Sequence, residues 1–162
     1  MIEIRAIRPE ELEIISRLIP TRQELFLVYP KGQFPFSLSQ VKKLYQQRFE
    51  FTVICEDDTI DGFANLYDLK PSKFAFIGNL FIVPEYRCKG LGKVLMQYMI
   101  KAIFEKYRLP EARLSVFSGN QPAMALYREF GFELYDQEQS IDPEGHVVKL
   151  LHMKLTNPSH VR

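Results

Sequence analysis

The chain has 162 residues and a mass of 19.0 kDa, which suits one ordinary domain and leaves too little length for two. Apolar residues make up 46% and charged residues 25%, a balance that argues against an intrinsically disordered chain. The 21 Lys and Arg residues nearly cancel the 20 Asp and Glu residues, so the net charge of +1 provides no general attraction to nucleic acid or to an anionic membrane.

The first third of the chain predicts one strand and three helical segments. Residues 2–7 alternate between apolar and polar side chains, as a strand does. Prolines begin and end a helix over 9–20. Residues 21–36 predict a short helix followed by an irregular loop, because two prolines and a glycine interrupt their second half. A capping box then begins another helix over 37–48.

The middle of the chain predicts three strands. Residues 51–56 and 60–69 flank an Asp-Asp-Thr turn and are typical of a β-hairpin. Residues 74–83 form a third, strongly apolar strand. Gly78 lies inside it, which predicts a bulge or a close backbone approach at that position.

The second half contains the clearest element, a helix over 91–103 whose apolar residues recur at steps of three and one. A strand over 112–118 follows, and Asn120 then caps a short helix that Gly131 closes. Two further strands are predicted, over 132–137 and 146–155. With no internal repeat, the sequence predicts one α+β domain over 1–155 and a flexible tail over 156–162.

We expect neither metal nor disulfide chemistry. Cys55 and Cys88 have neither zinc-ligand spacing nor a C-x-x-C arrangement, and the histidines His146, His152 and His160 show no metal spacing. No stretch approaches the roughly 18 uninterrupted apolar residues of a membrane span, and the alternating start is unlike a signal peptide. The expected protein is cytoplasmic, with reduced thiols and no membrane partner.

The most informative segment is the glycine-rich turn that follows the third predicted strand, residues 79–93. A strand ends, two glycines follow within the turn, and a long helix begins. The first N–H groups of a helix have no intrahelical partner, and the helix dipole adds partial positive charge there. Glycines let an anion approach the backbone closely, and Arg87, Lys89 and Lys93 add formal charge. The turn therefore predicts a seat for a phosphate or a pyrophosphate.

Two common phosphate motifs do not fit this turn. A dinucleotide fingerprint needs a third glycine where the chain has Leu95, and a Walker A loop needs Gly and Ser or Thr where it has Arg87 and Val94. The pattern that remains is Arg-x-x-Gly-x-Gly on a strand-to-helix turn. The alternative is that the glycines merely make a tight turn and that the cations are solvated.

A second motif follows in the correct order. The pattern Asn-x-x-Ala-x-x-Leu-Tyr-x-x-x-Gly-Phe runs from Asn120 to Phe132, after a long helix and a strand. With the glycine turn, it resembles the GNAT superfamily of acyl-CoA-dependent N-acyltransferases. In element order the resemblance covers about residues 2–155, and the specific motifs cover about 79–132. It implies a single GNAT-like domain, with a mixed, mostly antiparallel sheet splayed at its centre and helices on both faces.

The resemblance also implies a site for acetyl-CoA as co-substrate. The glycine turn would bind the pyrophosphate of coenzyme A through its backbone amides, and the pantetheine arm would lie as a pseudo-strand beside the splayed strand that precedes it. The pyrophosphate seat would consist of Arg87, Cys88, Lys89, Gly90, Leu91, Gly92 and Lys93. The pantetheine arm would lie against Leu80, Phe81, Ile82 and Val83.

Two further residues match the family's site. Asn120 would contact the pantetheine or line the site, although a helix N-cap is an equally good interpretation and the two can hold together. Tyr127 matches a tyrosine beside the cofactor sulfur, where a phenol can protonate the leaving thiolate. Tyr127 also falls on the apolar face of its helix, so the alternative is a packed core tyrosine.

The general base departs from the family pattern. Many relatives carry a glutamate on the strand before the glycine turn, but this position aligns with Phe76, and 74–84 has no carboxylate. The base could be a water chain held by Asn79 or by backbone carbonyls, a carboxylate such as Glu24, or solvent after positioning alone. The apolar segment 25–36 either belongs to the core or covers the acceptor groove.

The leading hypothesis is transfer of an acetyl group from acetyl-CoA to a primary amine by direct attack in a ternary complex. The alternatives are a non-catalytic acyl-CoA-binding sensor, which the missing glutamate favours, and a nucleotide-phosphate enzyme, which Leu95 and Val94 disfavour. The partners expected are acetyl-CoA and an amine-bearing small molecule or protein, with no nucleic acid. A homodimer stays open.

Overall fold

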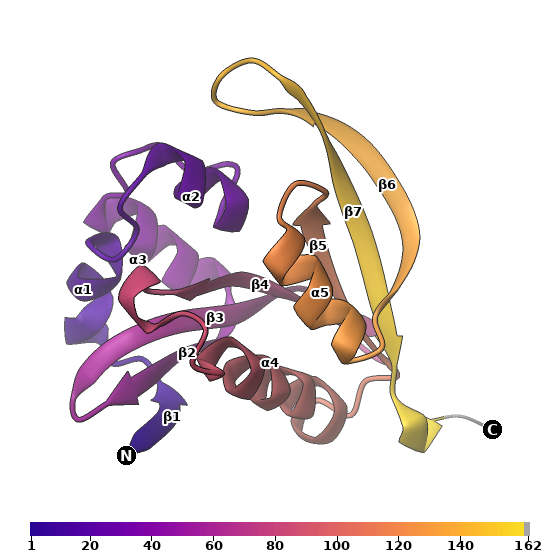
Figure 1. The fold of residues 1–162 in the computed structure, drawn as a ribbon. Helices are drawn as coiled ribbons and strands as arrows, with labels where there is room; N and C mark the ends of the chain where they lie inside the picture. Colours follow the sequence, from indigo (N-terminus) through magenta and orange to yellow (C-terminus); the bar gives the residue numbers. More distant parts are fainter. Residues whose placement is uncertain (161–162) are drawn as a thin grey trace. The chain divides into compact units, whose positions relative to one another are not determined.

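The computed structural model describes residues 1–160, which form a single domain around a seven-stranded sheet with the order β1-β2-β3-β4-β5-β7-β6 (Figure 1). β4 and β5 are parallel, whereas β1–β2, β2–β3, β5–β7 and β6–β7 pair antiparallel. The mixed, mostly antiparallel sheet that the resemblance implied is confirmed. The strands are β1 Ile2–Ala6, β2 Phe49–Glu56, β3 Thr59–Lys70, β4 Phe74–Ile82, β5 Glu111–Phe117, β6 Glu133–Ile141 and β7 Val147–Thr156.

Two helices begin at the caps that the sequence predicts, Ser37 and Asn120, and a third begins at Thr21. Thr21, Ser37 and Asn120 each accept a hydrogen bond from the backbone N–H three residues further on, which satisfies an N–H group that the helix cannot. The α-helices are α1 Leu12–Ser16, α2 Arg22–Val28, α3 Leu38–Gln47, α4 Leu91–Lys101 and α5 Gln121–Glu129. Shorter 3₁₀ segments cover Pro9–Glu11, Pro84–Tyr86 and Pro158–His160, and a π-helical turn, Ala102–Lys106, follows α4. Among residues 1–160, none of the helices has both the length and the apolar character that crossing a bilayer needs.

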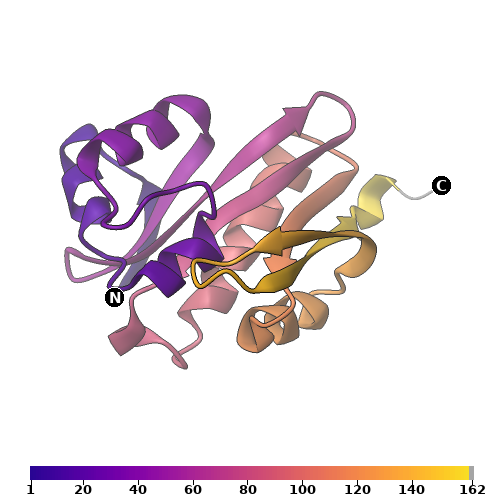
Figure 2. The same cartoon turned by 90° about the horizontal axis from the view of Figure 1, so that it is seen from above.

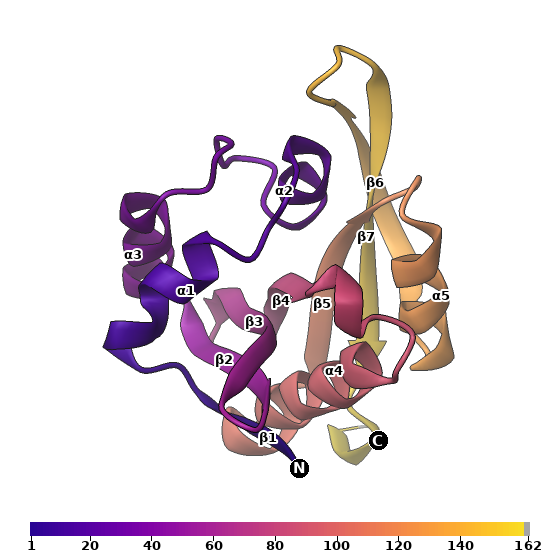
Figure 3. The ribbon, with the colours of Figure 1, turned by 60° about the vertical axis from the view of Figure 1, so that its left-hand side comes forward.

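The chain divides into two compact units, and β3 and β4 each run through both. The first unit comprises 1–67 and 78–99, and the second comprises 68–77 and the described residues from 100 onward. In the first unit, α1, α2 and α3 pack on one face of the strands, and α4 lies on the other (Figure 3). The helices on both faces that we expected are therefore present.

An aromatic ladder lies at the centre of the first unit's core. The rings of Phe51 and Phe63 stack at 5.8 Å between centroids, and Phe63 meets Phe81 at 6.0 Å. Leu25 and Phe36, from the segment over 25–36, are almost fully buried in the same cluster. Burying one such side chain contributes roughly 1.5–3 kcal/mol, so these contacts fix α2 against the strands.

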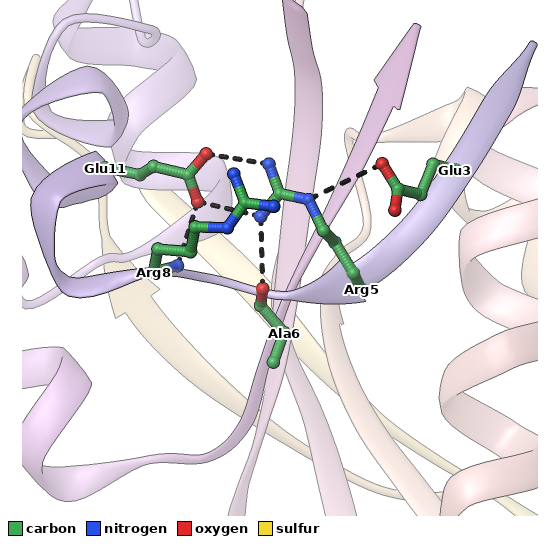
Figure 4. A network of polar contacts seen from close by, with 5 residues as sticks. All are labelled: Glu3, Arg5, Ala6, Arg8 and Glu11. Carbon is green, nitrogen blue, oxygen red and sulfur yellow. Dashed lines mark hydrogen bonds and ion pairs between the residues drawn. The ribbon is translucent and has the colours of Figure 1, made fainter. Parts of the chain in front are cut away.

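An ion pair fastens β1 to the 3₁₀ turn that follows it (Figure 4). Two nitrogens of Arg5 donate to the two oxygens of Glu11 at 2.8 and 2.7 Å, and the Arg8 backbone N–H donates to Glu11 at 2.9 Å. The Glu3 carboxylate lies 3.7 Å from Arg5 Nε. The hydrogen bonds from Arg5 lower the pKa of Glu11, and the same bonds raise the pKa of Arg5.

In the second unit, β5 lies between the first half of β4 and β7, and β7 forms a long hairpin with β6 (Figure 2). Helix α5 lies along one face of β5 and β7 in Figures 1 and 3. Alternate residues of β5, from Ala112 to Val116, are buried, whereas Arg113 and Ser115 on the opposite face are half-buried. The second face thus carries polar side chains.

The end of the chain is described only in part. β7 continues to Thr156, and the buried Asn157 donates from Nδ2 to the Leu109 carbonyl at 3.2 Å. Residues 161–162 of the predicted flexible tail lie outside the described residues.

Candidate active site

The glycine-rich turn opens helix α4 as the sequence predicts. Gly90 has φ of +83°, the left-handed region that glycine adopts without strain, and a Cβ there would meet nothing within 4 Å. The Val94 N–H donates to the Gly90 carbonyl at 3.1 Å, so the helix's hydrogen-bond ladder starts there and the preceding N–H groups point out of its end. Cys88, an exposed thiol, also has a positive φ, of +65°. The backbone at the turn can therefore surround an anion.

Arg87 holds this turn against the body of the first unit. Its Nε donates to the Ile82 carbonyl at 2.8 Å, and its guanidinium forms an ion pair with Glu24 of α2. The same group lies 5.2 Å from the centroid of the Phe81 ring. Because these contacts occupy its side chain, Arg87 fixes the shape of the turn, and Lys89 and Lys93 add further positive charge to the segment. The carboxylate of Glu24, which is one of the candidate bases, is thus paired with Arg87.

At the end of β4, the peptide groups are available for contacts more than the side chains are. Phe81 is 3% exposed and belongs to the apolar core, so its side chain faces the helices of the first unit. The Val83 N–H donates to the Asp61 carbonyl of β3 at 2.8 Å. The register between β4 and β5 ends at the pair Ile77 and Leu114, before either strand ends. Contact between Leu80–Val83 and a pantetheine arm is thus expected through peptide groups.

β4 takes a left-handed backbone conformation at Asn79, one residue after Gly78. Asn79 has φ of +54° and is 7% exposed. Its Oδ1 accepts from Asn65 Nδ2 at 2.8 Å, and its Nδ2 donates to the Val28 carbonyl of α2 at 2.6 Å. These two bonds hold this conformation in place, so the Asn79 side chain joins β3, β4 and α2. Oδ1 of the fully buried Asn65 makes no hydrogen bond within the described residues.

The close approach of the Tyr67 side chain requires a glycine at position 78. A Cβ there would lie 2.6 Å from the Tyr67 ring, and the guanidinium of Arg48 lies 4.4 Å from the centroid of that ring. The close approach that we expected at Gly78 is present, but the Tyr67 side chain makes it and not a neighbouring backbone.

Asp61 is a buried acid that the sequence did not indicate. It lies on β3 with no exposed surface, and among the described residues neither carboxyl oxygen has a hydrogen-bond donor. Burial is the main cause that raises the pKa of Asp61 to about 6, and the neighbouring carboxyl group of Glu56 adds to the shift. The positive charge of Lys89 opposes this shift. The alternation of apolar and polar residues along β3 gave no sign that Asp61 is buried. Asp61 occupies a fully buried position, which usually takes an apolar residue.

The second motif lies in the second unit. Asn120 is the N-cap of α5, with its Oδ1 accepting from the Ala123 N–H at 3.4 Å, so the cap interpretation is confirmed. Tyr127 is 8% exposed, and its ring meets that of Phe132 edge-on at 6.2 Å. The ring is therefore packed, and the part that its hydroxyl plays in catalysis stays a prediction.

The model of the acetyltransferase (GNAT) family matches residues 18–132. The chain belongs to the GNAT family. Over 134 residues, which are 80% of the chain and 74% of the relative, it is 25% identical to the prophage-derived N-acetyltransferase YokL of Bacillus subtilis. It is 34% identical to the spermine/spermidine N(1)-acetyltransferase of the same organism over 76 residues, which are 47% of this chain and 49% of that one.

Solved structures show the same GNAT fold. The ribosomal-protein-S18-alanine N-acetyltransferase of Escherichia coli superimposes with a TM-score of 0.78 at 19% identity, covering all of this chain and 99% of the other. The spermidine N-acetyltransferase of Vibrio cholerae, in complex with CoA and spermine, gives 0.80 at 20% identity and covers 96% and 95%. At such identities the likeness supports the fold and leaves the acceptor undetermined.

A polar cluster on the second unit of this GNAT chain was not predicted from the sequence. Ser115 of β5 and His152 of β7 are register partners, and Ser115 Oγ lies 2.7 Å from His152 Nδ1. The other ring nitrogen, Nε2, lies 3.1 Å from Glu138 Oε2 on β6. Sequence alternation places His152 on a strand face, but only the β5–β7–β6 register brings the three side chains together.

Proposed function

We propose that this GNAT chain transfers an acetyl group from acetyl-CoA to a primary amine by direct attack in a ternary complex. The observation that carries the proposal is the turn from Arg87 to Lys93, where glycines, positive φ values and the first N–H groups of α4 form an anion seat in a chain of this family. Relatives named as spermine/spermidine and peptidyl-lysine acetyltransferases act on amines, which supports an amine acceptor here.

In this proposal the chain's residues have distinct tasks. The backbone amides of the turn bind the pyrophosphate, with Arg87 anchored to Glu24 and Ile82 so that the turn keeps its shape. Peptide groups of Leu80–Val83 align the pantetheine arm. Asn120 contacts the arm while it caps α5, and the Tyr127 hydroxyl supplies a proton to the departing sulfur.

Binding at the turn is tested with Gly92→Glu. A carboxylate at that position would occupy and repel the phosphate site, so calorimetry should detect no acetyl-CoA binding. Gly92→Ala is the matched control, because it adds a methyl group without charge, and it should bind with nearly normal affinity. Normal affinity of Gly92→Glu would refute the assignment of the turn.

A sensor that binds acetyl-CoA without turnover is the second candidate, and the absence of a carboxylate from the strand segment 74–84 favours it. Thiol release separates the two functions. An enzyme releases CoA thiol when one of a panel of amines is added, such as spermidine, a lysine peptide or a peptide with a free N-terminus. A sensor binds acetyl-CoA and releases no thiol with any of them.

A further inference from the structure

The proposed transfer needs a group that removes a proton from the acceptor. A primary amine is mostly protonated near neutral pH and attacks a thioester only as the neutral base. The strand segment 74–84 has no carboxylate, Glu24 is paired with Arg87, and the Asn79 side chain is bonded to Asn65 and Val28. Besides water or solvent, a titratable group elsewhere in the chain is then the remaining candidate for the base.

The contacts of His152 indicate which tautomer its neutral ring takes. Glu138 is a carboxylate and accepts hydrogen bonds, so the ring nitrogen facing it, Nε2, carries the hydrogen. A neutral ring then has its lone pair on Nδ1, which accepts from the Ser115 hydroxyl at 2.7 Å. This arrangement leaves the lone pairs of Ser115 Oγ able to accept a proton from a further donor. Hydroxyl, imidazole and carboxylate thus stand in series.

The position of Ser115 along β5 is informative. The register between β4 and β5 ends at the pair Ile77 and Leu114, and Ser115 is the next residue of β5. It lies on the face of β5 opposite the buried Leu114, and its side chain is half-buried. His152 is only 17% exposed, and its ring lies 6.2 Å from that of Tyr135. A hydroxyl backed by a shielded imidazole therefore marks the point where β5 leaves its register with β4.

We propose that Ser115, His152 and Glu138 form a proton relay that deprotonates the acceptor amine, a role that rests on the proposed acetyl transfer. One proton of the ammonium passes to Ser115 Oγ while the serine's own proton moves to His152 Nδ1, and Glu138 stabilises the imidazolium. The neutral amine then attacks the carbonyl carbon. The C–S bond breaks, the nitrogen's second proton ends on the sulfur, and His152 returns its proton to water. The products are the amide, CoA thiol and one proton.

In this relay Ser115 is the catalytic residue, and His152 and Glu138 are positioning residues that act through it. The charged and titratable groups of the second unit that surround His152 are Glu138, Asp136 and Tyr135 on β6, Lys154 on β7 and Arg113 on β5. Arg113 is itself paired with Glu111 at 2.9 Å and lies 3.8 Å from the centroid of the Phe74 ring. Glu138 is thus the carboxylate that contacts the imidazole.

The relay is tested with His152→Gln, whose amide can keep hydrogen bonds to both neighbours but cannot take up a proton. The matched control is His146→Gln, because His146 lies near the hairpin turn and is 76% exposed. With the best acceptor among spermidine, a lysine peptide and an N-terminal peptide, His152→Gln should lose about 10²-fold in kcat/KM for the amine. Its calorimetric affinity for acetyl-CoA should stay unchanged.

Two further variants separate a relay from a structural role. Ser115→Ala should lose as much kcat/KM for the amine as His152→Gln does. Ser115→Thr, which keeps a hydroxyl group, should retain most of the activity. Glu138→Gln should give a smaller loss of activity. The Glu138 side chain is 62% exposed, so this substitution does not disturb the core. The pH–rate profile of the wild type should contain a limb that is absent from the profile of His152→Gln.

The outcomes separate the two proposals. If the wild type acetylates an amine and the Ser115 and His152 variants do so at the wild-type rate with the wild-type pH profile, the relay is refuted and the transferase stands. If the wild type releases no thiol with any amine, the proposed function fails and the relay fails with it. Loss of activity together with loss of acetyl-CoA affinity would make the three residues structural.

Discussion

Replacing Asp61 by asparagine should stabilise the protein at neutral pH. Asp61 has no exposed surface, its carboxyl oxygens have no hydrogen-bond donor among the described residues, and the carboxyl group of Glu56 is a neighbour, so its ionised form lacks both water and a donor. Asparagine has almost the same shape and carries no charge. The variant therefore removes an unfavourable ionisation without opening a cavity.

The size of the gain follows from the raised pKa. Burial shifts the pKa of Asp61 from 3.8 to about 6. At about 1.4 kcal/mol per pH unit, this amounts to about 3 kcal/mol of free energy of unfolding. The unfolded chain ionises from about pH 4, whereas the folded protein keeps the proton until about pH 6. Asp61 thus lowers stability progressively between these pH values and by a constant amount above them.

Urea unfolding of both proteins at several pH values between 4 and 8 measures this effect. The Asp61→Asn variant should exceed the wild type by about 3 kcal/mol at pH 8 and by almost nothing at pH 4. Asp58→Asn is the matched control, because Asp58 is exposed and asparagine tolerates its φ of +70°. A variant that is less stable than the wild type at pH 8, or a difference that does not change with pH, would refute the assignment of Asp61 as a buried, destabilising acid.

Two other substitutions test the contacts described above. Glu11→Gln should cost about 1–3 kcal/mol at pH 7, because the Arg5 guanidinium loses its carboxylate partner. Since Arg5 lowers the pKa of Glu11, that cost should vanish as the pH falls through the lowered pKa, and an unchanged cost at pH 2 would contradict the ion pair. Tyr127→Phe should slow single-turnover acetyl transfer by roughly 10²-fold while the affinity for acetyl-CoA stays constant. Transfer within about twofold of the wild type would make Tyr127 a core residue only.

Local signals in the sequence predicted the elements that short-range chemistry determines. Ser37 and Asn120 mark helix starts because a side-chain oxygen must satisfy an N–H group three residues away. The apolar stripe of α4 indicates a helix because buried residues recur with its period. The glycine turn could be found for the same reason, since Gly90 takes a backbone conformation that other residues avoid.

The features that the sequence did not predict depend on register between distant strands. Ser115 and His152 become neighbours only because β5 and β7 pair, although α5 and β6 separate them along the chain. Asn79, next to Gly78, takes a positive φ that the sequence did not predict, and its amide bonds to both Asn65 and Val28. Such bonds join segments whose proximity no local pattern encodes.

Acetyl transfer to an amine is tested most directly by measuring the mass of the acceptor after incubation with acetyl-CoA and the purified protein. Spermidine, a lysine peptide and a peptide with a free N-terminus serve as acceptors, and released CoA thiol is counted in the same samples. We expect that at least one amine gains a single acetyl group, with one thiol released for each acetyl transferred. Acetyl-CoA that binds the protein while every amine keeps its original mass would contradict it.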